Sequence, residues 1–385
     1  MNLLNFYKKV RAYSLHLCDP LYIEDYIPQV AEHTSPPKWH LAHTTWFFEE
    51  MILKKIDSNY IEFNPQFNFL FNSYYQTIGE RAIRDQRGVM TRPLVSEVKK
   101  YRDYVDEKMF LLLSKEIDND LSDLIILGLN HEQQHQELLI TDLKYTFSHN
   151  PIHPVYKENF SLVNDENQGK QEWILIEEGT YKIGHKKNDG FSFDNELGRH
   201  KVYINNFKIS NHLVTNKEYL EFIEAGGYTN FGYWLDEAWY WLQENKIEAP
   251  LYWKKNNNDW YYYTLSGLQK VNPNAIVTHI SFYEAQAFAT WKGMRLPTEF
   301  EWESASSLIN WGQRWEWTYS AYLPYPKFNI ADGAVGEYNG KFMINTMVLR
   351  GSSNATAEGH SRKTYRNFFH PKFRWQCNGI RLVKK

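Results

Sequence analysis

GLNHEQQHQELLI, at residues 128–140, is the stretch around which this chain is organised. On a helix of about 3.6 residues per turn, His131 and His135 stand four positions apart and present two imidazoles on one face. That spacing brings both rings near enough to hold a single metal ion. Two ligands do not complete a metal site, so the rest of the chain must supply at least a third.

Length and charge limit the classes of protein to which the chain can belong. At 385 residues it exceeds the size at which one core usually stops growing, which predicts more than one domain. With 43 Lys+Arg against 46 Asp+Glu, the formal net charge of -3 gives no electrostatic argument for binding nucleic acid or an anionic membrane. No apolar run approaches the ~20 residues that span a bilayer. The first residues lack the charged segment, apolar core and small-residue cleavage site that a signal peptide has in that order. Because Cys18 and Cys377 are too few for a disulfide framework, we expect a soluble, cytoplasmic protein.

The first 150 residues have the pattern of a helical bundle. Apolar stripes predict helices at residues 5–16, 39–53, about 95–113 and about 118–147. Four such helices imply an antiparallel bundle, and bundle cores are where metal sites are built from facing helices. His43, among apolar and aromatic neighbours on the second helix, is the best candidate for the third ligand, and a hydrogen-bonded core histidine is the alternative. Other histidines of this half, such as His40, lie nearer helix ends or loops and are weaker candidates.

A long connection, residues 64–92, separates the second and third of these helices. It has no strong periodicity, but its aromatic content argues against disorder, and such loops are commonly functional. Tyr74 and Tyr75 could offer a phenol to a reaction at the metal. Arg84 and Arg87, three positions apart, could together grip a carboxylate. Aromatic packing and solvated arginines explain the same residues equally well.

The residue pattern changes after about residue 150, where the helical periodicity ends. Residues 151–170 are polar and irregular, so we expect a linker there. The pattern beyond them predicts strands at 172–176 and 201–204 and helices at 216–225 and 283–291. The second half, residues 171–385, is therefore expected to be an α+β domain with much irregular structure.

Motifs in both halves carry a family resemblance. RLPTEFEWE at residues 295–303 resembles the signature of the formylglycine-generating-enzyme and sulfatase-modifying-factor fold, which is C-type-lectin-like. Further parts of that pattern stand at residues 195–197, 214–216, 226–228 and 349–353. The upstream half, with LAH at 41–43 and HEQQHQE at 131–137, is similar to a DinB-like bundle. A chain that joins these modules in this order resembles the iron-dependent sulfoxide synthases of ergothioneine biosynthesis.

The resemblance implies an α+β chain with a four-helix DinB-like bundle at residues 1–150 and a formylglycine-generating-enzyme-like domain at 171–385 that closes the active site. It implies that Fe(II) is held by His43, His131 and His135, with room left for O2 and a thiolate. Enzymes of this family join the sulfur of a thiol to C2 of the imidazole of hercynine, which is trimethylated histidine, and oxidise that sulfur to a sulfoxide.

Positions that match other functional residues of the family follow from the same resemblance. Gln134 matches the contact to the histidine-derived substrate. Tyr74 and Tyr75 match a tyrosine pair in one branch, where a phenol near iron donates a proton or hydrogen atom during the oxygen chemistry. Arg84 and Arg87 match the arginines that bind the carboxylate of the thiol substrate.

The second domain would add substrate contacts from residues 367–369. Asn367 matches a substrate-contacting position, and Phe368 and Phe369 could face a quaternary ammonium through cation–π attraction. Members of the family that take γ-glutamylcysteine have an acidic residue where this chain has Phe369. Its absence, together with the tyrosine pair, favours free cysteine as the sulfur donor.

The chain departs from the family pattern at two places. RGSSN at residues 350–354 replaces the usual Arg-Gly-Gly-Ser-Trp run, which puts the backbone freedom of that loop in doubt. Formylglycine generation needs a cysteine pair in this fold, whereas the second half contains only Cys377. That activity is therefore not expected.

Other functions compete with this one. Residues 131–135 also satisfy H-E-x-x-H, the zinc-hydrolase pattern in which a glutamate, here Glu132, activates a metal-bound water. A non-catalytic binding module would use the histidines only as core. Related synthases take histidine in place of hercynine, as in ovothiol synthesis, or a selenosugar in place of the thiol, as in selenoneine synthesis.

Overall fold

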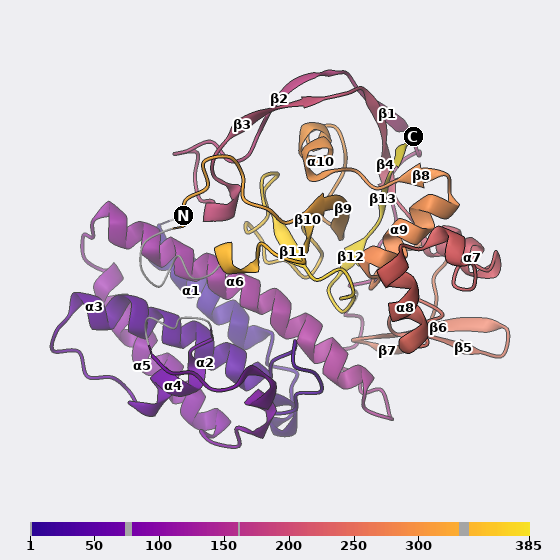
Figure 1. Ribbon diagram of the computed structural model, residues 1–385. Coiled ribbons are helices and arrows are strands. Elements are labelled where there is room, and N and C mark those ends of the chain that lie inside the picture. The colour runs from indigo at the N-terminus through magenta and orange to yellow at the C-terminus, as the bar shows by residue number, and fades with distance from the viewer. Residues whose placement is uncertain (1, 74–78, 161, 331–338) are drawn as a thin grey trace. The chain divides into compact units, whose positions relative to one another are not determined.

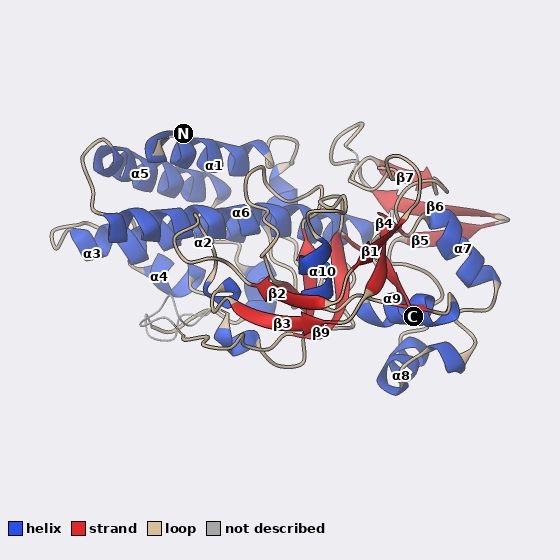
Figure 2. Cartoon of the chain, turned by 90° about the horizontal axis from the view of Figure 1, so that it is seen from above, coloured by secondary structure: helices blue, strands red, loops and turns tan. Residues whose placement is uncertain are grey.

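The computed structural model describes residues 2–73, 79–160, 162–330 and 339–385. The chain divides into two compact units. Unit 1 contains Met1–Ile152 and Ala355–His360, and unit 2 contains His153–Ile330, Asn339–Asn354 and Ser361–Lys385. Unit 1 is helical, whereas the strands belong to unit 2 together with further helices (Figure 2). The mixed helix-and-sheet class is therefore confirmed. Among the described residues, no helix has the length and apolar character needed to cross a membrane.

Helices form unit 1, and the long ones lie where the sequence predicts helices. They are α1 Leu3–His16, α2 Pro37–Phe48, α3 Lys54–Ile56, α4 Gln66–Phe71, α5 Val95–Leu113 and α6 Asn119–Ser148. The helices α1, α2, α5 and α6 pack on one another, with α6 as the long helix of the unit (Figure 1). Asp118 caps α6 by accepting a hydrogen bond from the backbone N–H of Leu121, and Pro37 occupies the first turn of α2.

The helix α2 is the buried centre of unit 1. Every residue from Pro37 to Phe48 is buried, so α2 meets packing partners all round rather than along one stripe. It continues into a π-helical turn at Glu49–Leu53, a deviation that is frequent near functional sites. The helix predicted at residues 39–53 is therefore confirmed, with an earlier start and a change of winding at its end.

The connection at residues 64–92 contains more structure than its pattern predicts. It holds α4 and a 3₁₀ helix at Arg84–Val89. Phe67 and Phe71, four positions apart on α4, are buried and lie edge to face at 5.1 Å between ring centroids. This i,i+4 aromatic pair anchors a short helix in a connection whose sequence showed no strong periodicity. Tyr74 and Tyr75 lie outside the described residues.

Small sheets and covering helices form unit 2. Its strands are β1 Trp173–Ile176, β2 Gly179–Ile183, β3 His200–Ile204, β4 Phe207–Leu213, β5 Trp253–Asn256, β6 Asp259–Thr264, β7 Gly267–Lys270, β8 Met294–Arg295, β9 Trp315–Ala321, β10 Met347–Gly351, β11 Asn367–Phe369, β12 Asn378–Gly379 and β13 Arg381–Lys384. The sheets have the strand orders β1-β4-β13-β8, β11-β10-β9-β12, β5-β6-β7 and β2-β3. The helices are α7 Asn216–Glu224, α8 Asp236–Glu244, α9 Phe282–Trp291 and α10 Glu299–Ala305.

The signature at residues 295–303 forms β8 and the helix α10, which packs against β2 and β3 and also against β9 and β10 (Figure 1). Its glutamates Glu299 and Glu303 are buried and ion-paired with Arg366 and Arg350. Between them, the ring of Trp302 is fully buried in the apolar core of the unit. The motif therefore joins two sheets through one helix, which explains why these residue types stand at this spacing.

The departure from the family pattern at residues 350–354 is accommodated by the backbone. The positive φ of +91° belongs to Gly351, where an added Cβ would come within 3.3 Å of the Trp302 ring. Ser352 is not among the described residues with positive φ. The serine that replaces the second glycine of the family therefore needs no unusual conformation.

Residues of the expected linker, from His153 onward, belong to unit 2. Tyr156 and Val163 are buried there. Asp165 pairs with the buried Arg314 at 2.6 Å. This polar stretch is thus packed and hydrogen-bonded within unit 2.

Candidate metal centre

Two helices of unit 1 bring three histidines together. His43 lies on α2, and His131 and His135 lie on α6. Their ligand nitrogens are all within 4.8 Å of one another, and all three side chains are buried. The ring centroid of His43 lies 5.0 Å from the ring centroid of His131 and 4.7 Å from that of His135. The four-residue spacing on one helix and a single residue on the facing helix therefore create a compact cluster of nitrogen donors.

Hydrogen bonding leaves nitrogen atoms of this cluster without partners. The Nδ1 atom of His43 lies 2.6 Å from the carbonyl oxygen of Phe71, and since a carbonyl only accepts, Nδ1 carries the hydrogen. The Nε2 atom of His43 then has a lone pair, and it is buried with no partner among the described residues. Nδ1 of His131 is likewise buried with no partner among the described residues. Buried polar atoms without partners are rare, and a metal ion in the cluster would satisfy them.

The electrostatics of the cluster favour neutral rings. Burial lowers the pKa of His131 to about 4. The pKa of His43 falls well below the ordinary value because of burial and the neighbouring charge of His131. The pKa of His135 is lowered in the same direction by burial and by His131 and His43. Neutral imidazoles at pH 7 are the form that binds a metal, and three of them suit a divalent transition metal such as Fe(II), so the residues present fit the ion.

A second pair of buried groups extends from His135. The Nδ1 atom of His40 lies 2.9 Å from Nδ1 of His135, and Nε2 of His40 lies 3.2 Å from Oδ2 of Asp142. Both His40 and Asp142 are buried. Sequence reasoning underrated His40 because it was placed near a helix end. Two signals could have found the pair, since His40 stands three positions before His43 on one helix and Asp142 stands two helical turns beyond His135.

An aromatic ring links the cluster to one of the predicted substrate residues. Trp39 stacks on His43 with 4.4 Å between ring centroids and 14° between planes. The guanidinium of Arg87 lies 3.4 Å from the centroid of the Trp39 ring, a cation–π contact. Arg87 is buried and donates hydrogen bonds to the hydroxyls of Ser35 at 2.8 Å and Ser73 at 3.1 Å. The connection at residues 64–92 therefore lies close to the histidines through this arginine.

The other predicted residues of unit 1 have different surroundings. Arg84 is exposed and donates to the carbonyl oxygen of His33 at 3.1 Å, so the two arginines do not share one environment. Gln134 is half-buried on α6, next in the chain to His135. Its position lies at the edge of the helix face that carries the ligands, since each residue turns the helix by about 100°.

The predicted residues of unit 2 lie together on β11. Asn367, Phe368 and Phe369 are half-buried. Phe368 stacks on Tyr322 with 4.2 Å between centroids and 9° between planes, and Phe369 meets the edge of Trp375 at 5.2 Å. Both aromatic side chains are therefore held by further aromatic rings.

Glu132, the glutamate of the H-E-x-x-H string, has a different role from the histidines beside it. Its carboxylate is fully buried and accepts hydrogen bonds from Arg11 at 2.9 Å, from Arg102 at 2.9 Å and from Ser14 at 2.6 Å. Burial opposes its ionisation, but the charges of Arg11 and Arg102 outweigh that effect and lower the pKa of Glu132 to about 2. A carboxylate held by two arginines is a poor base for a metal-bound water, which removes the main support for the zinc-hydrolase alternative.

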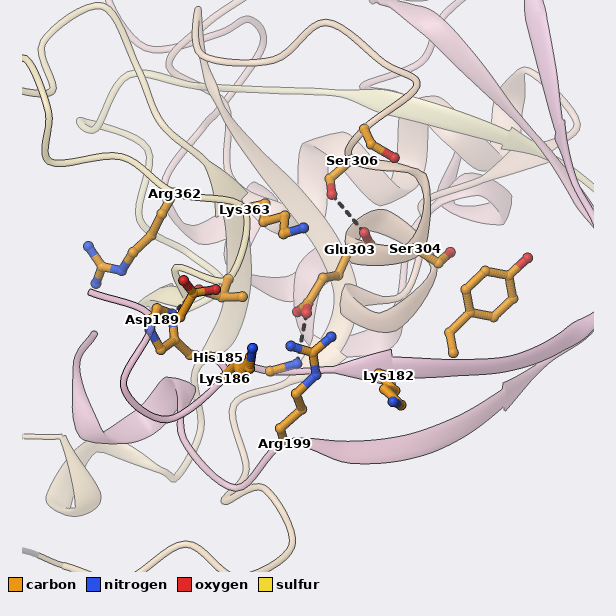
Figure 3. A pocket seen from close by; sticks show the side chains of 14 residues that line it. Lys182, His185, Lys186, Asp189, Arg199, Glu303, Ser304, Ser306, Arg362 and Lys363 are labelled. Carbon is orange, nitrogen blue, oxygen red and sulfur yellow. Dashed lines mark hydrogen bonds between the residues drawn. The ribbon is translucent and has the colours of Figure 1, made fainter. Parts of the chain in front are cut away.

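Unit 2 contains a polar pocket of its own, with a volume of about 290 Å³. Figure 3 shows lysines and arginines around the carboxylate of Glu303. Glu303 accepts a hydrogen bond from the backbone N–H of Gly184 at 2.7 Å and is ion-paired with Arg350. The described residues that line this pocket include none of the predicted site residues.

Comparison with known proteins gives relatives for both halves of the chain. Residues 159–310 match the family model of the sulfatase-modifying factor enzyme 1-like domain. The chain is 27% identical to the hercynine oxygenase of Mycolicibacterium smegmatis, with 91% of each chain covered. It is 25% identical to the hercynine oxygenase of Mycolicibacterium thermoresistibile, with 91% of this chain and 87% of that protein covered. A shorter match, 30% identical over 34% of this chain and 48% of the other, joins it to the formylglycine-generating enzyme of Thermomonospora curvata.

Proposed function

We propose, from the premise that this chain is a member of the hercynine oxygenase family with a sulfatase-modifying-factor domain, that it forms a C–S bond between hercynine and a thiol. In this reaction the C2–H bond of the hercynine imidazole and the S–H bond of the thiol break, and a C2–S bond forms. One oxygen atom of O2 becomes the sulfoxide oxygen, and the other leaves as water with the two hydrogens. The enzyme is thus an Fe(II)- and O2-dependent sulfoxide synthase of ergothioneine biosynthesis.

The observation that carries this proposal is the buried cluster of His43, His131 and His135, with neutral rings and nitrogen atoms that lack partners. Bound Fe(II) would supply activation of O2 and a position for the thiolate, because three protein ligands leave coordination positions open. Trp39 and the Phe71 carbonyl hold the ring of His43 in one orientation. Orientation of this kind keeps the donor set ready without rearrangement.

Further residues are assigned to the substrates on the family resemblance. They are Gln134 for hercynine, Arg84 and Arg87 for the carboxylate of the thiol, Tyr74 and Tyr75 for proton or hydrogen-atom donation, and Asn367, Phe368 and Phe369 for hercynine and its ammonium group. Of the two arginines, Arg87 has the stronger support, since it contacts the Trp39 ring that stacks on His43. Phe369, which is not acidic, favours cysteine over γ-glutamylcysteine.

The test is product analysis after aerobic incubation of the chain with Fe(II), using ¹⁸O2. Hercynine or histidine is combined with cysteine, γ-glutamylcysteine or a selenosugar, and the products are identified by mass spectrometry. We expect the hercynine–cysteine sulfoxide with one ¹⁸O atom, and O2 uptake only when both substrates are present. Uptake that ignores hercynine would overturn the proposal.

The same experiment decides between the related functions. Turnover of histidine alone would assign the chain to ovothiol-type synthesis, and turnover of the selenosugar to selenoneine-type synthesis. Formylglycine generation is not favoured, because unit 2 has the single cysteine Cys377, which is buried as a free thiol.

A further inference from the structure

Beside the three histidines lies a pair of buried groups, His40 and Asp142, for which the proposed function gives no role. We infer that they are positioning residues that fix the tautomer of His135, so that His135 presents its Nε2 atom to the metal. The identity of the metal rests on the proposed function. The tautomer itself is a property of the chain without any metal.

The direction of each hydrogen bond can be assigned by starting at Asp142 and proceeding through His40 to His135. Oδ2 of Asp142 accepts the backbone N–H of Ser35 at 2.8 Å, and the same oxygen faces Nε2 of His40 at 3.2 Å. An oxygen that serves as an acceptor requires His40 to carry its hydrogen on Nε2. Nδ1 of His40 is then a lone pair, so the hydrogen between the two rings must belong to Nδ1 of His135. The Nε2 atom of His135 is left as the donor to a metal.

The arrangement matches the one at His43 while using different groups. There, the backbone carbonyl of Phe71 accepts the hydrogen of Nδ1 at 2.6 Å and leaves Nε2 for a ligand. At His135, the side chain of His40 takes the part of that carbonyl. Two of the three candidate ligands are thus held in the same tautomer by independent means. Such outer partners fix ring orientation and raise ligand basicity.

Burial explains why the pair acts as more than packing. His40 on α2 and Asp142 on α6 have relative exposures of 3% and 2%, so water does not substitute for a lost partner. Without an acceptor at Nδ1 of His40, a hydrogen on Nδ1 of His135 would be buried and unpaired, which is unfavourable. The alternative tautomer of His135, with its hydrogen on Nε2, would then become populated and would block metal binding.

Two substitutions of His40 separate the effect of its hydrogen bond to His135 from the effect of its side-chain volume. His40→Asn places an amide oxygen near the position of Nδ1 and can still accept from His135. His40→Leu has a similar shape and no acceptor. His149→Leu, at the exposed end of α6, is the matched control. The readouts are ¹⁵N NMR of the histidine rings in the metal-free chain and anaerobic titration with Fe(II).

We expect His135 to carry its hydrogen on Nδ1 in the wild type and in His40→Asn. In His40→Leu we expect a mixture of tautomers and an Fe(II) affinity about 10–100-fold weaker, while His149→Leu changes neither. His40→Leu that folds with unchanged tautomer and affinity would overturn the inference. So would a wild-type spectrum with the hydrogen on Nε2 of His135, a result that needs no variant to fold. A wild-type chain that binds no Fe(II) but shows the Nδ1–H tautomer would instead count against the proposed function.

Discussion

Two adjacent residues of α6, His131 and Glu132, are both polar and buried, yet their surroundings are opposite. Glu132 accepts hydrogen bonds from two arginines and a serine. Nδ1 of His131 has no partner among the described residues. Both belong to one unit and one helix, so the difference lies in which face of α6 each side chain occupies. A buried polar group without a partner needs an explanation, which a bound metal would give for His131, whereas a saturated group such as Glu132 indicates a structural role.

The buried charges of unit 2 follow the pattern of Glu132. Arg381 and Glu316 are both fully buried, and their atoms approach to 2.6 Å. The indole N–H of Trp302 donates to the same carboxylate. This group is saturated in the way that Glu132 is. We therefore attribute a structural role to it.

The largest expected effect is the loss of iron when a histidine of the cluster is replaced. His131→Ala removes one of three nitrogen donors, and we expect the anaerobically loaded chain to fall from about one Fe(II) to background. Metal analysis after desalting measures this. His149→Ala, a histidine outside the cluster, should keep its iron. Full iron content in His131→Ala, or stoichiometric zinc with peptidase activity in the wild type, would contradict the assignment.

Substitution of Glu132, whose carboxylate is fully hydrogen-bonded, should instead lower the stability of the fold. Glu132→Gln leaves Arg11 and Arg102 without their shared carboxylate, so we expect the free energy of unfolding to fall by about 3–5 kcal/mol. Urea denaturation of the metal-free chain measures the loss, with the exposed Glu107→Gln as control. If Glu132→Gln unfolded like the wild type and lost only catalytic activity, the comparison would fail and a general-base role would gain support.

As the pH falls, His131 and Glu132 should lose their contributions to the free energy of unfolding in different pH ranges. The folded pKa of His131 is about 4, below its ordinary 6.5, so the unfolded chain takes up the proton first as pH falls. This contribution to stability is complete above pH 6.5 and is lost towards pH 4, by about 3 kcal/mol. The folded pKa of Glu132 is about 2, below 4.5, so its contribution disappears in the lower window from pH 4.5 to 2.

Urea titrations of the metal-free chain between about pH 7.5 and 2 test this order. We expect His131→Ala to lose part of the upper window only, and Glu132→Gln to lose the lower one. Stability that stays level in the wild type from pH 7 to 4 would show that the histidines are not buried in neutral form.

Local patterns account for what could be predicted. The helices α5 and α6 follow from apolar periodicity, and the pairing of His131 with His135 follows from the helical repeat. The helix expected at residues 283–291 is α9, and Ser281 and Glu284 form a capping box at its start. The helix α4 was missed because an aromatic pair in a six-residue segment gives too little periodicity to detect.

The sequence by itself determined which residues could face one another along a helix, because that depends only on the repeat of the backbone. It therefore placed the two imidazoles of α6 on one face, and it offered His43 on α2 only as a candidate for the third ligand. Only the tertiary structure decided how these groups are used. The arginine partners of Glu132 are 121 and 30 residues away in the chain, and His40 meets His135 across 95 residues. Burial and hydrogen bonding between such distant residues exist only after the helices pack, and they distinguish the candidate metal ligand His131 from the ion-paired Glu132 next to it in the chain.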